Sequence, residues 1–385
     1  MTAEIVIMNR SGIVMAADSV VTSRTPLGGK TYPTANKLFA ITYDQSIGIM
    51  TYGSAEFIFT PWENLIKVYR HDVEKRKEVF KTVEDCCTDF INYLQTSNLF
   101  TIDEQKKWTL NVFSQYHSSI SFQIKSHIQE YLSQKDNKKS DNDLEIVVRN
   151  VFKNIINETK KSLSCNYIND EYIQSIKTET NEIIKEIYEM LSESYFEEIN
   201  ELTNLFFKLN PGSLSGIVIS GFGEQEIKPY LISLNIIDMR NNHLIYNKKE
   251  TNQGGMYPFA QTEVVKLFMR DINPYCQIKI NKIIKDAVPN NSDQIIKEIE
   301  KYIDENSQPK GIILDSLPLP DLASAAENLV SLTSFHRRFS ADLETVGGPI
   351  DVAAISKGDG FIWIKRKHYF DPDLNQHFVG KYYYK

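Results

Sequence analysis

Four residues in the first part of the chain have the types and spacing of a nucleophilic site: Thr2, Asp18, Lys37 and Gly53. The small residue behind Met1 favours removal of that methionine, which would leave Thr2 with a free α-amino group. The hydroxyl of an N-terminal Thr is a nucleophile, and its own amine, with a reference pKa of about 7.7–8.0, can take the hydroxyl proton. This combination predicts chemistry through a covalent acyl intermediate on Thr2.

The other three residues have supporting roles in this hypothesis. An ammonium on Lys37 would lower the pKa of the amine, and Asp18 would hold that ammonium in place. Lys30, in a Gly-rich loop, is the second candidate for the cation. In "MTYGSAEF" we expect a strand to end at Gly53 and a helix to begin near Ser54. A glycine N–H and the positive end of a helix could then face an oxyanion.

A predicted hairpin must bring the first two of these residues together. The apolar runs 3–8 and 13–17 are separated by "NRSG", which is typical of a short β-turn. A three-residue loop would place Glu4 opposite Asp18, with Thr2 as a diagonal neighbour on the same face. Because two facing carboxylates repel, this arrangement requires a cation nearby. A two- or four-residue loop would put Thr2 and Asp18 on opposite faces.

The remaining sequence predicts β-structure at both ends and helices between them. Apolar spacings of three and four in 78–207, split by polar loops such as "SQKDNKKSDND", indicate an all-helical insertion. This order predicts an α+β fold, sheet on sheet with helices outside, formed by 1–77 and 208–385. The expected strands are 37–42, 46–53, 215–223, 229–238, 243–250 and a hairpin around "KGDG", and the expected helices lie within 54–73, 258–272, 292–306 and 321–340, the last capped by Asp321.

Composition excludes several classes of function. A formal net charge of −7 gives no basic field for nucleic acid or an anionic membrane, and no apolar run approaches the roughly 20 residues of a membrane span. The histidines form no HxxxH or HExxH pattern, and no GxGxxG or GxxxxGK[ST] motif is present, so we expect neither a metal nor another cofactor. Without a secretory signal or a CxxC pair, the chain is predicted to be cytoplasmic.

Four stretches of the chain resemble the proteasome β-subunit family of N-terminal nucleophile (Ntn) hydrolases, and the related bacterial peptidases of the two-component ATP-dependent type. They follow the order of that family and make up roughly a quarter of the chain. These stretches are "TAEIVIMNRSGIVMAADSVVTS", "NKLFAITYDQSIGIMTYGSAE", "SGIVISGFGEQEIKPYLISLN" and "TVGGPIDVAAISKGDG". The resemblance implies a four-layer αββα sandwich in which Thr2 is nucleophile and base, Asp18 and Lys37 are its electrostatic partners, and Gly53 is the oxyanion donor.

The chain departs from the family pattern in three places. The family has a Ser beside the nucleophile in a Gly/Ser-rich turn, whereas the matching stretch here, "NQGGMYPFAQ", contains none. An Asp and a Ser precede the family's C-terminal Gly pair, where this chain has "ADLETVGG", so that Thr345 or Asp342 could substitute. The helical insertion is foreign to ordinary members, and it could cap the active-site face, replace ring contacts or recruit a partner.

The leading hypothesis is a threonine-type peptidase or amidohydrolase that acts on peptides or unfolded proteins and self-associates, with any ATPase partner unknown. A non-catalytic scaffold or assembly subunit is the second hypothesis, and the missing Ser favours it. A small-molecule amide hydrolase is the third, because the same chemistry opens non-peptide amides.

Overall fold

The computed structural model describes residues 3–25, 28–42, 44–133, 141–162, 164–191, 193–209, 215–339, 346–368, 370–377 and 380. Thr2 lies outside the described residues, and so do Asp342 and Thr345. Ala3, the residue after Thr2, is the first residue of the first strand.

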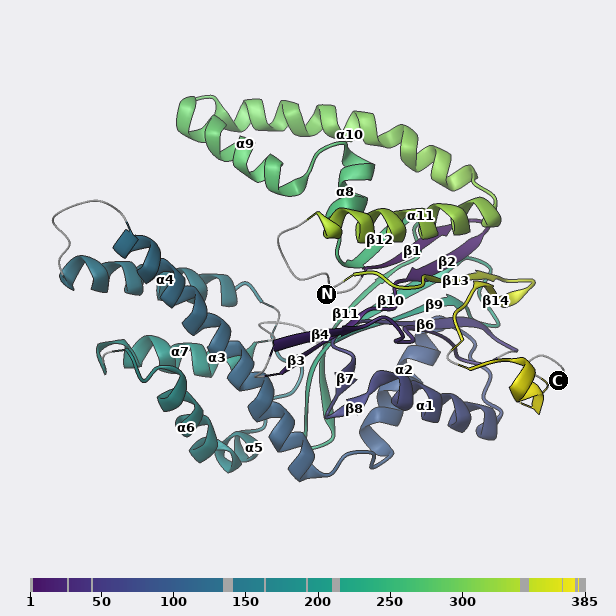
Figure 1. Ribbon diagram of the computed structural model, residues 1–385, viewed down its shortest axis with the longest axis horizontal. Coiled ribbons are helices and arrows are strands. Elements are labelled where there is room, and N and C mark those ends of the chain that lie inside the picture. The colour runs from purple at the N-terminus through teal and green to yellow at the C-terminus, as the bar shows by residue number, and fades with distance from the viewer. Residues whose placement is uncertain are drawn as a thin grey trace.

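Two five-stranded antiparallel sheets form the centre of the molecule (Figure 1). The first sheet has the strand order β12-β1-β2-β13-β14 and the second has β11-β10-β9-β6-β5. The strands of the first sheet are β1 (Ala3–Asn9), β2 (Gly12–Ala17), β12 (Gly255–Ala260), β13 (Asp351–Ser356) and β14 (Gly360–Lys365). Those of the second are β5 (Leu38–Ala40), β6 (Ser46–Gly53), β9 (Ser215–Phe222), β10 (Tyr230–Arg240) and β11 (His243–Thr251).

Two small hairpins lie outside the large sheets. The first joins β3 (Val21–Thr25) to β4 (Gly28–Tyr32). The second joins β7 (Glu56–Phe57) to β8 (Thr60–Pro61). Both occupy sequence in which we expected a loop or a helix. The first lies between Asp18 and Lys37, and the second follows Gly53.

Helices lie on the outer face of each sheet. On the first sheet, α11 packs against β1, β2 and β13, with α8, α9 and α10 beyond it (Figure 1). These helices are α8 (Glu263–Arg270), α9 (Pro274–Ala287), α10 (Ser292–Ser316) and α11 (Leu319–Arg338). On the second sheet, α2 and α3 pack against β10. The helices on this side are α1 (Trp62–Arg76), α2 (Val83–Thr96), α3 (Ile102–Ser133), α4 (Asp141–Thr159), α5 (Asp170–Ser175), α6 (Lys177–Ile187) and α7 (Phe196–Lys208). A 3₁₀ turn, η1 (Glu193–Tyr195), precedes α7. A second 3₁₀ turn, η2 (Asp373–Asn375), follows β14.

Apolar side chains fill the space between the sheets and beneath the helices. Met15 and Val6 of the first sheet pack with Met50 and Val218 of the second, all of them fully buried. The opposite face of the first sheet packs on α11. Strand alternation explains this division, because successive residues of β1 and β2 point to opposite faces and both faces are covered.

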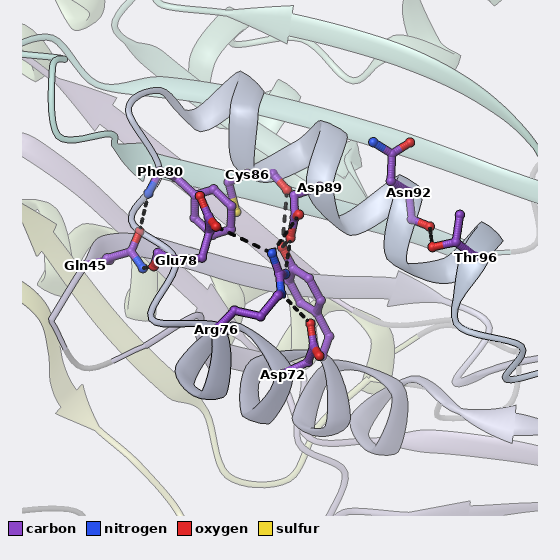
Figure 2. A network of polar contacts seen from close by, with 10 residues as sticks. Gln45, Asp72, Arg76, Glu78, Phe80, Cys86, Asp89, Asn92 and Thr96 are labelled. Carbon is purple, nitrogen blue, oxygen red and sulfur yellow. Dashed lines mark hydrogen bonds and ion pairs between the residues drawn. The ribbon is translucent and has the colours of Figure 1, made fainter.

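Polar contacts join α1 to α2 (Figure 2). Arg76 donates to Asp72 one turn before it and to Asp89 on α2, and the Tyr69 hydroxyl donates to the same Asp89 carboxylate. The side chain of Thr82 caps α2 by accepting from the backbone N–H of Asp85. These contacts fix the two helices against each other beneath the second sheet.

The first hairpin differs by one residue from the predicted register. The turn contains two residues, so that Asn9 pairs with Gly12, and Glu4 lies opposite Ala17 instead of Asp18. A side chain would not fit at Gly12, because a Cβ at this position would lie 2.6 Å from the carbonyl oxygen of Ile355 on β13. The prediction that Glu4 and Asp18 face each other across the ladder is therefore wrong, and the three-residue loop from which we inferred that Thr2 and Asp18 share a face does not form.

Several helix boundaries also differ from the prediction. The first helix begins at Trp62 and not near Ser54. Residues 255–260, part of which we assigned to a helix, pair with β1 as strand β12. The N-cap of α11 is Pro318, so Asp321 lies in the first turn and does not cap it. The predicted strands at 215–223, 229–238 and 243–250 and the hairpin around "KGDG" are confirmed.

The helices between 83 and 208 occur where the periodicity predicted them. The first of them, α2, packs directly on β9, β10 and β11, while α4, α6 and α7 have their most numerous contacts with other helices. Among the described residues, no helix is both long enough and apolar enough to cross a membrane.

Candidate active site

Three of the four predicted site residues lie at the ends of strands, on the same side of the two sheets. Asp18 follows the last residue of β2, Lys37 precedes β5, and Gly53 is the last residue of β6. The carbonyl of Lys37 accepts from the N–H of Thr51 at 2.9 Å, which continues the pairing of β5 with β6 and fixes the backbone at Lys37.

Lys37 lies between two buried carboxylates. Its Nζ is 2.5 Å from Oδ1 of Asp18 and 3.2 Å from Oε1 of Glu4. The exposed fractions are 5% for Lys37, 1% for Asp18 and 2% for Glu4, so bulk water hardly screens these interactions. The structure therefore brings Lys37 to Asp18, whereas Lys30, the second candidate, lies exposed on β4.

Backbone donors hold the Asp18 carboxylate from two further directions. The N–H of Ala3 donates to Oδ1 at 3.1 Å, and the N–H of Gly347 donates to Oδ2 at 2.8 Å. The backbone N–H of Asp18 also donates to the carbonyl of Ala3 at 3.1 Å. Because β2 ends at Ala17, the Asp18 side chain is not bound by strand alternation and reaches Lys37 despite the shifted register.

Gly53 has a backbone conformation that favours glycine. Its φ is +80°, a left-handed backbone that glycine adopts without steric cost. It lines a cavity of about 460 Å³ together with Lys37, and the first residues of α1, Trp62 and Glu63, line the same cavity. Lys37, Gly53 and the positive end of α1 therefore border one cavity, although the helix begins later than predicted.

Other charged and polar groups surround this cluster. Asp351 on β13 accepts from the backbone N–H and the ammonium of Lys367. The pKa of the Lys367 ammonium is lowered overall. Burial is the largest cause, Asp351 raises the pKa, and the nearby Lys37 lowers it further. The pKa of the Tyr52 phenol is raised overall. Burial is the largest cause, the hydrogen bond with Ser233 lowers the pKa, and the Glu4 carboxylate raises it.

Sequence reasoning missed the Asp351–Lys367 pair and the Gly347 donor. Lys367 follows the last strand, about 330 residues from Lys37, and no local pattern connects the two. The "VGG" of the resemblance was the available signal for Gly347. In place of the family's Ser-containing turn, "NQGGMYPFAQ" forms β12, in which Ala260, with φ +59°, pairs with Ala3.

The arrangement suits a reaction that needs a buried cation beside the start of β1. An ammonium held by two carboxylates can influence a neighbouring amine, and a backbone N–H in an accessible cavity can stabilise an oxyanion. Within the part of the chain that the structure describes, no group of three or more His, Cys, Asp or Glu side chains is placed to hold a metal ion.

No protein-family model matches the chain, and no curated protein is significantly similar to it. Two of the similar solved structures are of Anbu. A Gly-1 mutant of Anbu from Hyphomicrobium sp. strain MC1 has a TM-score of 0.30 at 11% identity, covering 99% of this chain and 94% of that chain. Anbu from Yersinia bercovieri, described as an ancestral beta-subunit, has a TM-score of 0.28 at 11% identity, covering 98% and 94%. Likenesses this remote carry no conclusion about activity or site residues.

Proposed function

We propose that the chain is a threonine-type Ntn hydrolase of proteasome-like architecture, a four-layer αββα sandwich with a helical insertion at 78–207. Thr2, freed by removal of Met1, is the nucleophile and the base in this proposal. Asp18 and Lys37 are its electrostatic partners, and Gly53 is the oxyanion donor. The observation that supports it most is the hydrogen bond from Ala3 to Asp18, because one peptide bond then separates Thr2 from the residue bound to the ion pair.

The proposed reaction has two steps. The amine of Thr2 takes the hydroxyl proton while the hydroxyl oxygen attacks a substrate carbonyl, and the negative charge on the carbonyl oxygen is stabilised by the N–H of Gly53. Collapse of this intermediate breaks the amide bond, and the leaving amine accepts the proton. Water, deprotonated by the same amine, then hydrolyses the ester and regenerates the Thr2 hydroxyl.

Peptides or unfolded proteins are the proposed substrates, and self-association is part of the proposal, with any ATPase partner unidentified. The helices of the insertion would cap the active-site face, replace ring contacts or recruit a partner. Small non-peptide amides are the second class of substrate, since a cavity of about 460 Å³ is within the size range of small-molecule sites.

A non-catalytic scaffold is the competing function. The stretch that pairs with β1 as β12 contains no Ser, which favours a scaffold because that stretch supplies no seryl hydroxyl. The buried ion cluster and the left-handed Gly53 favour catalysis, since Lys37 and Gly53 line the same cavity.

Hydrolysis of a fluorogenic peptide library and of simple amides tests the proposal. The wild-type chain should show turnover, Thr2→Ser should keep part of it, and Thr2→Ala should lose it. Thr96→Ala, which removes a hydroxyl on the exposed side of α2, is the matched control and should keep full activity. Absence of turnover in wild type with every substrate, or equal turnover in Thr2→Ala, would favour the scaffold.

A further inference from the structure

Lys37 has a second carboxylate partner, Glu4, that an ion pair with Asp18 does not require. Glu4 lies on β1 two residues after Thr2, on the face that also carries Val6 and Met8 and packs against the second sheet. It is 2% exposed, and its Oε1 lies 3.2 Å from the ammonium of Lys37. Placing a carboxylate here is costly, because buried charges lose their hydration.

Charged groups of both signs surround Lys37. Asp18 and Glu4 contact Lys37 directly, and Lys367 lies close enough to affect Lys37 but is itself paired with Asp351. Among the described residues these are three carboxylates and two ammoniums, and the His368 imidazole lies close enough to Asp351 for that carboxylate to raise its pKa. The Tyr52 phenol also lies near Glu4, whose carboxylate raises the pKa of that phenol.

Groups at the rim of the cavity carry further charges. Glu63 lies on α1 at the cavity and is paired with Lys67 at 2.5 Å, and its carboxylate also raises the pKa of Lys367. Glu56, which also lines the cavity, is exposed, so solvent and salt screen its charge.

We propose that Glu4 is a positioning residue that acts through Lys37: it offsets the charge of the Lys37 ammonium, so that the α-amino group of Thr2 stays protonated to a higher pH than Asp18 and Lys37 alone would allow. This inference rests on the proposed function, in which the neutral amine is the base. It means that the protein is least reactive at low and neutral pH and becomes more reactive as pH rises.

The expected size of the effect follows from covalent geometry. Thr2 and Glu4 are two residues apart, so their Cα atoms lie no more than about 7 Å from each other. A unit charge at about that distance, with an effective dielectric constant between about 20 and 80, shifts a pKa by roughly half a unit to one and a half units.

The test measures the α-amine itself and needs no turnover. The full chain from Thr2 to Lys385 is released from an N-terminal fusion, and the rate of reductive methylation of the Thr2 amine is followed against pH by mass spectrometry of the N-terminal peptide. A free peptide with the sequence "TAEIVIM" in the same tube corrects for the reagent. Glu4→Gln removes the charge, and Glu4→Thr, a strand-favouring substitution, does so with a different shape.

We expect the midpoint of the amine titration to fall by roughly half a unit to one and a half units in Glu4→Gln and Glu4→Thr. Glu56→Gln, which removes an exposed carboxylate from the same cavity, should shift it by less than about 0.2 units. An unchanged midpoint in the folded Glu4 variants, or an equal shift in Glu56→Gln, would overturn the inference. A chain that cleaves nothing still gives this titration, so failure of the proposed function is seen separately.

Discussion

The N–H of Ala3 donates to Oδ1 of Asp18 at 3.1 Å, and the same oxygen lies 2.5 Å from the ammonium of Lys37. This shared oxygen ties the start of the first strand to a buried cation. A free N-terminus at position 2 would therefore be covalently attached to the residue that the ion cluster holds.

Removing the cation tests how strongly the cluster depends on it. Lys37→Met would leave the carboxylates of Asp18 and Glu4 buried without their partner, and we expect the free energy of unfolding to fall by about 3–5 kcal/mol. Urea denaturation at pH 7 measures this change. Reactivity toward an amide substrate should fall as well.

Two further variants show whether charge or packing is responsible. Lys67→Met breaks the more exposed pair with Glu63 and should cost less than about 1 kcal/mol. Adding Asp18→Asn and Glu4→Gln to Lys37→Met should restore part of the lost stability, because no unpaired charge remains buried. A loss of under 1 kcal/mol in Lys37→Met would show that the carboxylates do not need this ammonium.

Gly53 and Gly360 allow backbone strain to be separated from function. Both have positive φ, +80° and +75°, so alanine at either position should cost about 1 kcal/mol of folding free energy. Only Gly53 lines the cavity, and a Cβ at Gly360 would meet nothing within 4 Å. We expect Gly53→Ala to slow acylation about a hundredfold, through displacement of the substrate carbonyl, and Gly360→Ala to leave the rate unchanged. Equal rates in the two variants would rule out an oxyanion role for Gly53.

A buried histidine makes the stability of the helical region depend on pH. Burial lowers the pKa of His117 on α3 from 6.5 to about 4. The unfolded chain therefore binds the proton more readily than the folded chain, so stability is constant above pH 6.5 and falls as pH drops toward 4. Between pH 7.5 and pH 5 the free energy of unfolding should decrease by about 2 kcal/mol from this group alone.

Urea denaturation at several pH values measures this dependence. His117→Gln should remove most of it, whereas His127→Gln, an exposed histidine on the same helix, should leave it in place. The hypothesis is wrong if His117→Gln keeps the full loss of stability between pH 7.5 and pH 5.

The sequence predicted the strands and helices well where their periodicity was long and their faces were buried. The strands that form β9, β10 and β11 and the helices between 83 and 208 are examples. The strand β12 was missed because its pairing with β1 joins residues about 250 positions apart, which local spacing does not reveal. The α1 boundary was missed because Glu56–Pro61 forms a tight hairpin before the helix.

The ion pair of the site was predicted correctly for a partly wrong reason. Lys37 forms an ion pair with Asp18. The prediction assumed that Glu4 lies opposite Asp18, whereas the two-residue turn places Glu4 opposite Ala17. Glu4 and Asp18 still share the cation, because Asp18 lies beyond the end of its strand and is free to turn. Where a side chain points after a strand ends depends on tertiary contacts such as the N–H of Gly347, and these are not local in sequence.

The most direct measurement of the central claim is mass spectrometry of the chain after treatment with a β-lactone probe. The account predicts that the wild-type chain lacks Met1, gains one probe mass, and carries it as an ester on Thr2, while Thr2→Ala gains none. A chain that retains Met1, or a Thr2→Ala variant labelled as fully as the wild type, would contradict it.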